Sequence, residues 1–134
     1  MPASLPIHAR HWQPQLGAAG EVVHDVGDVE QCIRVILTTP RGADPLRPRF
    51  GCDAWRFIDM PVTEARPYLT RAIHEAIDEW EPRAKLVRVQ LVDRMAAAGH
   101  VGLIVQWRLM IDGGAVGAER STNFATGDFA PGAA

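Results

Sequence analysis

The chain has 134 residues, of which 47% are hydrophobic and 22% charged, with a formal net charge of −2. This length and composition predict one soluble globular domain with a modest core. The nearly balanced charge and the lack of a membrane-length apolar run argue against nucleic acid and membranes as partners.

Residues 1–26 have no sustained hydrophobic period and contain several prolines and a Gly-Ala-Ala-Gly run. We therefore expect an extended or disordered N-terminal arm. A first helix is predicted from Asp28 to Thr38, with Asp28 as its N-cap and apolar residues at helical spacing behind it. Cys32 falls on the apolar face of this helix and is expected in the core.

A long irregular segment from Arg41 to Val62 follows, and it is too apolar to be a solvated loop. We expect it to pack over the core. A second helix is predicted from Glu64 to Trp80, because apolar residues recur there at i, i+3 and i+4. Pro82 ends this helix, because its ring removes a backbone donor and disfavours the helical conformation at Glu81.

Three strands are predicted after this corner, over residues 85–93, 101–111 and 115–124. Val87, Val89 and Leu91 alternate with polar residues in the first strand, and Trp107 shares one apolar face of the second strand.

The order of these elements predicts an α+β fold, with two main helices packed on a small antiparallel β-meander. Asp112-Gly113-Gly114 is a hairpin turn signal between the last two strands. We expect the domain to span residues 27–126 and a flexible tail to span residues 127–134.

The sequence offers weak support for a metal site or a catalytic site. His8 and His11 have a plausible ligand spacing but lack further ligands nearby, so we expect neither a metal nor a cofactor. Glu75, Asp78 and Glu79 share the polar face of the second helix, which favours a solvated surface over a glycosidase carboxylate pair. We therefore expect that the protein is not an enzyme. The alternative is a lysozyme-like peptidoglycan hydrolase.

Four motifs in chain order resemble those of the contractile-tail baseplate protein W and gene-25-like wedge family. This family occurs in phages, R-type pyocins and type VI secretion baseplates. The motifs are Ile36-Leu37-Thr38-Thr39-Pro40-Arg41-Gly42, Arg47-Pro48-Arg49-Phe50-Gly51-Cys52-Asp53, Phe57-Ile58-Asp59-Met60-Pro61 and Trp80-Glu81-Pro82-Arg83.

The resemblance implies a structural baseplate component that acts as the sheath initiator. It would offer its C-terminal β-strands to the first sheath ring and dock to wedge proteins, in multiple copies around a sixfold baseplate. The tail tube or hub is a further implied partner. The implied location is the virion tail baseplate, assembled in the host cytoplasm. A general adaptor that uses the same sheet edge for another filament is a further alternative.

Three segments are the candidate partner-binding sites. The Pro82 corner is expected to dock wedge proteins, although a local salt bridge at a helix stop is the simpler interpretation. The loop Arg47–Asp53, called the arginine loop below, is expected to supply contact residues around a core Phe50. The last strand is too polar for burial on both faces, which suits an exposed edge. The candidate residues are Glu81, Pro82, Arg83, Arg47, Arg49, Asp53, Ser121, Thr122 and Asn123.

Overall fold

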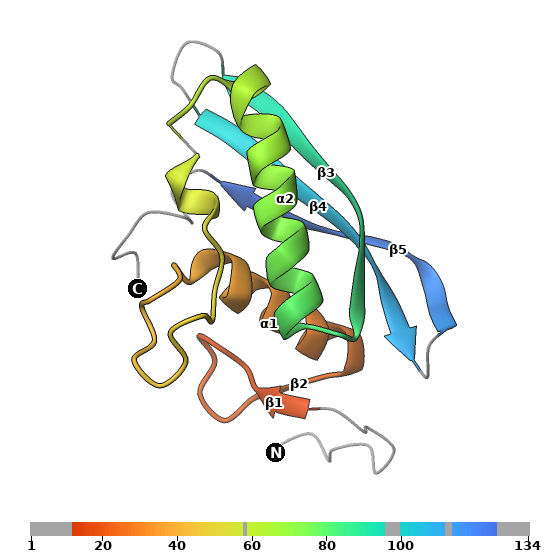
Figure 1. Ribbon diagram of the computed structural model, residues 1–134. Helices are drawn as coiled ribbons and strands as arrows, with labels where there is room; N and C mark the ends of the chain where they lie inside the picture. The colour runs from red at the N-terminus through yellow and green to blue at the C-terminus, as the bar shows by residue number, and fades with distance from the viewer. Residues whose placement is uncertain (1–11, 58, 96–99, 112–113, 126–134) are drawn as a thin grey trace.

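The computed structural model describes residues 12–57, 59–95, 100–111 and 114–125. It confirms the α+β fold, with two helices and a meander of three long strands (Figure 1). The elements in chain order are β1 (Trp12–Pro14), β2 (Val22–His24), α1 (Asp25–Thr38), the short 3-10 helix η1 (Ala54–Arg56), α2 (Val62–Trp80), β3 (Ala84–Met95), β4 (His100–Ile111) and β5 (Gly114–Ala125).

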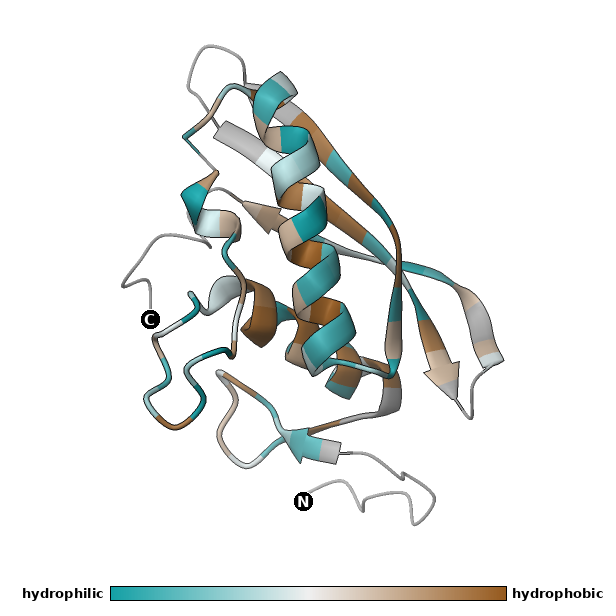
Figure 2. Cartoon of the chain, viewed as in Figure 1, coloured by the Kyte–Doolittle hydropathy of each residue, from teal (hydrophilic) through white to brown (hydrophobic). Residues whose placement is uncertain are grey.

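The main sheet has the strand order β3-β4-β5, and both pairs are antiparallel. Helix α2 lies along one side of this sheet, and α1 packs beneath its C-terminal end (Figure 1). The side of α2 turned to the viewer in Figure 2 is mostly hydrophilic, whereas much of β4 behind it is hydrophobic. The arrangement therefore buries the face of the sheet that the helices cover.

The core lies between the two helices and the covered face of the sheet. Trp107 and Val105 of β4 are fully buried there, as predicted, against Ile73 of α2 and Ile33 of α1. The buried Nε1 of Trp107 donates to the Thr122 hydroxyl at 3.0 Å, so its polar group is satisfied inside the core.

A register shift in β3 changes the alternation that the sequence predicts. The shift lies between Leu86 and Arg88, and it places Val87 on the exposed face. Leu86, Val89 and Leu91 pack against the core instead. A β-bulge adds one unpaired residue and so reverses the facing of the residues before it, which the period-two pattern alone cannot reveal.

The N-terminal segment differs from the expected arm. Strands β1 and β2 pair antiparallel as a small hairpin that contacts α1. The Gln13 side chain donates to the Asp28 carbonyl at 3.0 Å, and Gln31 of α1 bonds both Leu16 and Pro14 of the hairpin. The expected arm over residues 1–11, the expected tail over residues 127–134 and the turn at residues 112–113 lie outside the described residues.

Both helices begin earlier than predicted. Helix α1 begins at Asp25, so Asp28 is a residue of its first turn and not its N-cap. Helix α2 begins at Val62 and contains Pro67 as its sixth residue, just beyond the four first-turn amides that have no partner within a helix. None of the helices in the described ranges is long and apolar enough to cross a membrane.

Candidate functional site

The corner after α2 holds a buried carboxylate. Glu81 is the C-cap of α2, and its amide donates to the Ile77 carbonyl at 2.8 Å. Pro82 is exposed, and the chain then enters β3 at Ala84. The Glu81 side chain is only 4% exposed, so the corner directs this acid inward.

Arg83 satisfies that carboxylate and reaches across to α1. Its Nε and Nη2 donate to the two oxygens of Glu81 at 2.8 and 2.9 Å, a bidentate pair. Its Nη1 donates to Oδ2 of Asp28 at 2.7 Å. The Asp28 side chain is 6% exposed, so Arg83 is shared between two buried acids. Their hydrogen bonds and charges raise the pKa of Arg83, which keeps it cationic.

Cys32 borders this network and is half-buried, in contrast to the predicted core position. Its Sγ accepts from Gln13 at 3.4 Å and from Arg83 at 3.6 Å. Burial, with the charges of Glu81 and Asp28, raises the pKa of Cys32. Burial also raises the pKa of Cys52, to about 11. Both thiols are therefore protonated and poorly nucleophilic at neutral pH.

The outer side of the corner faces an open groove of about 470 Å³. The groove has buried Ile77 and Ala84 at its floor, and the exposed charged residues Asp78 and Lys85 at its rim. It is lined by His74, Ile77, Asp78, Pro82, Arg83, Ala84, Lys85, Leu86 and Met110. The corner therefore combines an internal ion-pair network with a surface concavity.

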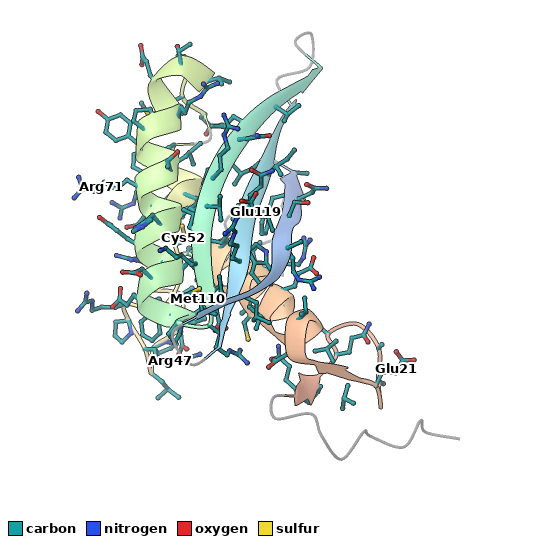
Figure 3. All side chains as sticks on the ribbon, turned by 90° about the vertical axis from the view of Figure 1, so that its right-hand side faces the viewer. Glu21, Arg47, Cys52, Arg71, Met110 and Glu119 are labelled. Carbon is teal, nitrogen blue, oxygen red and sulfur yellow. The ribbon has the colours of Figure 1, made fainter. Side chains whose placement is uncertain are left out.

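The arginine loop lies beside the C-terminal end of α2, where Figure 3 labels Arg47. The Phe50 ring is buried as expected, edge-on to Trp80 at 5.2 Å between centroids. The Arg47 guanidinium stacks on Phe50 at 4.1 Å from the ring centroid. Arg49 pairs with Glu79 of α2 at 3.2 Å, and Asp53 pairs loosely with Arg56 at 3.8 Å.

The three candidate residues of β5 do not share one environment. Ser121 and Asn123 are exposed, as expected for an edge strand. The Thr122 side chain is instead buried, because it faces the helices and accepts the Trp107 hydrogen bond. Arg34 of α1 donates to the Asn123 carbonyl at 3.2 Å and lies over the Phe124 ring at 5.0 Å.

Sequence reasoning missed the two α1 residues that join these segments. Asp28 is of a residue type common at helix N-caps. Its role as a partner of Arg83 depends on a contact between residues that are 55 positions apart in the sequence. Arg34 reaches β5 from 89 residues away. No local pattern encodes such contacts, so only co-variation among relatives would have indicated them.

Two of the three acids considered on the polar face of α2 are held in ion pairs with arginines. Glu75 is exposed and pairs with Arg71 at 2.9 Å on the outer side of the helix, where Figure 3 shows Arg71 pointing away from the sheet. The Arg71 hydrogen bond lowers the pKa of Glu75, which is the opposite of the shift a general acid needs. The Glu79 carboxylate forms ion pairs with both Arg41 and Arg49. Among the described residues, no group of three potential ligands could hold a metal ion.

Comparison with known proteins assigns this domain to a family. The family described as Baseplate wedge protein gp25 matches residues 23–113, which is more than half of the chain. The chain belongs to this baseplate wedge family. The match begins at β2 and includes the arginine loop, the Pro82 corner and β4. Most of the N-terminal hairpin and all of β5 lie outside the match.

Several solved structures have the same fold. A chain of the pyocin R2 baseplate after contraction is 27% identical, with a TM-score of 0.59 over 69% of this chain and 92% of that one. A candidate tail lysozyme from Geobacter sulfurreducens is 27% identical, with a TM-score of 0.61. The alignment covers 73% of this chain and 86% of that chain.

A chain of a type VI secretion baseplate complex shares the fold at 19% identity, with a TM-score of 0.51 over 75% of this chain and 98% of that chain. A comparison with curated proteins finds no significant match.

Proposed function

We propose that this wedge-family protein is a structural component of a contractile-tail baseplate and initiates the sheath by accepting a sheath strand at β5. Family membership supports the baseplate assignment. The observation that carries the initiator role is the position of β5 at the end of the order β3-β4-β5. Within the described residues no strand follows it, and such an edge is a template for strand addition.

The contact between Arg34 and Asn123 supports strand addition at the outer edge of β5. Because β4 lies on the other side of β5, this hydrogen bond indicates that the Asn123 carbonyl points out of the sheet. In an antiparallel strand the amide and carbonyl of one residue point to the same side. An incoming strand would therefore meet the backbone of Asn123 and Ser121, with Arg34 displaced from the carbonyl.

The most direct test is co-expression of the tagged chain with the sheath and wedge proteins encoded beside it. We expect recovery of a complex, with sheath polymer growing from it in electron micrographs. Recovery of the chain alone, although all partners are soluble and present, would contradict the proposal. Adding the tail tube and hub proteins to the same co-expression would test the proposed tube or hub contact, and the electron micrographs would test the proposed sixfold copy number.

The groove beside the Pro82 corner is the proposed wedge-docking surface. Its floor is apolar and its rim carries Lys85, an exposed residue at the start of β3. Glu81 and Arg83 form ion pairs inside the protein. Their role in docking would therefore be to fix the positions of Pro82 and of the groove. An apolar floor with a charged rim is typical of protein interfaces.

Charge reversal of the groove rim tests this docking surface. We expect Lys85→Glu to weaken recovery of the wedge partner by about tenfold or more, the effect of ~1.4 kcal/mol, without changing thermal stability. Arg88→Glu is the matched control, because Arg88 is also exposed on β3 but does not line the groove. Equal losses in both variants would point to general electrostatics and against the groove.

The alternative function, a peptidoglycan hydrolase, has one observation in its favour, namely the description of the Geobacter sulfurreducens neighbour. The exposed, ion-paired state of Glu75 argues against it. We expect the purified chain to leave peptidoglycan turbidity unchanged, and Glu75→Gln to behave identically. Clearing by the wild type that Glu75→Gln abolishes would establish the hydrolase instead.

A further inference from the structure

The loop between α1 and η1 carries the most exposed large hydrophobic side chain of the described residues. Leu46 is 92% exposed, compared with 67% for Leu16. Figure 2 shows a hydrophobic segment between hydrophilic ones near the outer end of this loop. Single exposed leucines are common on protein surfaces and carry no function by themselves. The distinguishing feature of Leu46 is the rigidity of the loop that presents it.

The base of the loop is closed by backbone hydrogen bonds. The Cys52 amide donates to the Thr39 carbonyl at 2.9 Å, and the Gly42 amide donates to the Pro48 carbonyl at 3.0 Å. Gly51 has a φ of +115°, and a Cβ there would lie 2.2 Å from the Thr39 oxygen. Only glycine fits this crossing. The two backbone hydrogen bonds hold the ends of the loop together.

The outer part of the loop is fixed by Asp44. Its carboxylate accepts the Leu46 amide at 3.0 Å and the Arg47 Nε at 3.0 Å. These hydrogen bonds, that of Arg47 first, lower the pKa of Asp44, so the turn keeps its charged form at neutral pH. Arg47 in turn rests on the buried Phe50 ring. The leucine backbone is thus tied to the core through two side chains.

The loop that presents Leu46 carries Arg41, Arg47 and Arg49, and the ion pairs of these three arginines involve only two carboxylates, those of Asp44 and Glu79. Arg41 and Arg49 share the single carboxylate of Glu79, at 3.6 and 3.2 Å. Arg49 remains 79% exposed in that pair. An apolar residue flanked by surplus positive charge is complementary to an apolar pocket with carboxylates at its rim.

We propose that Leu46 is an anchor that inserts into an acid-rimmed apolar pocket of a neighbouring baseplate protein. The inference rests on the proposed function for the presence of that neighbour. A leucine held in a rigid loop binds with little loss of conformational entropy. Burying its side chain would strengthen the contact by about 30-fold, and Arg49 would orient toward the acidic rim.

Photo-crosslinking in assembling tails tests this anchor. A benzophenone amino acid replaces Leu46 in the full chain, the tails are purified after irradiation, and the crosslinked peptides are sequenced. We expect a crosslink to another baseplate protein, at a segment with apolar residues and nearby Asp or Glu. A crosslink only to a second copy of this chain, or none although the chain is present in the tails, would overturn the inference alone.

Substitution at the same position gives a quantitative measure. We expect Leu46→Asp to lower the copies of the chain per purified tail by about tenfold, with an unchanged melting temperature because the side chain is exposed. Leu46→Met and Leu16→Asp are the controls and should incorporate normally. Normal incorporation of Leu46→Asp would refute the anchor. Absence of the wild-type chain from purified tails would overturn the proposed function, and this inference with it.

Discussion

Replacing Arg83 with alanine is expected to lower the free energy of unfolding by about 3 kcal/mol, because it strands two buried acids. Glu81 and Asp28 have side chains only 4% and 6% exposed, and Arg83 is bonded to both. Without Arg83, Glu81 loses its bidentate partner and Asp28 loses the ion pair that joins α1 to the corner. Thermal unfolding of the purified chain should show a midpoint lower by about 10 °C.

The matched control for this prediction is Arg71→Ala. Arg71 also pairs with a glutamate, but on the exposed side of α2, where ion pairs contribute little. We expect its midpoint to stay near that of the wild type. If Arg83→Ala has the same unfolding midpoint as Arg71→Ala and the wild type, the ion pairs around Asp28 do not stabilise the domain. Arg83 would then be available for direct contact with a docking partner.

Replacing Asn123 with proline is expected to yield baseplates that do not nucleate sheath. The substitution removes an amide donor that we place on the outer edge of β5, and proline is tolerated where a strand amide points outward. The hydrogen bonds between β4 and β5 should therefore survive. We expect sheathed tails to fall by about tenfold or more in electron micrographs, while sheathless baseplates continue to form.

Asn123→Ala separates the backbone effect from the side-chain effect, because it removes the carboxamide and keeps the amide donor. Normal sheath formation with alanine and loss with proline would locate the interaction in the backbone. Sheathed tails at wild-type frequency in both variants would argue against strand addition at β5. A circular dichroism melt of each variant distinguishes a failed edge from an unfolded sheet.

Periodicity and breaker residues predicted most of the fold. The i, i+3, i+4 spacing before Trp80 and the stop at Pro82 placed the C-terminal end of α2 correctly. Alternation also predicted three strands, each within about two residues of the observed bounds. These signals are local, and the burial of one face of each element produces them directly.

The arrangement of the candidate site could not be predicted in the same way. The Glu81 and Arg83 pair suggests an outward-facing corner, but Asp28 from α1 draws Arg83 inward. Thr122 was expected at an exposed edge, but the buried indole donor of Trp107 requires an acceptor opposite it. Both results depend on which residues meet in space, and hydrophobic patterns do not report such pairings.

The N-terminal hairpin was missed for a related reason. Its strands have three residues each, too short to show a period of two. They are held instead by contacts with α1, in which Gln13 and Gln31 bond backbone groups of the opposite element. Composition alone therefore favoured an arm where tertiary contacts make a docked hairpin.

Sheath-strand addition at β5 is tested most directly by a cryo-electron microscopy reconstruction of the baseplate with its first sheath ring attached. We expect a strand of the sheath protein hydrogen-bonded along the outer edge of β5, passing Ser121 and Asn123, with Arg34 moved away from the Asn123 carbonyl. A reconstruction in which β5 faces solvent, or lies against a non-sheath protein while the sheath attaches elsewhere, would contradict the central claim.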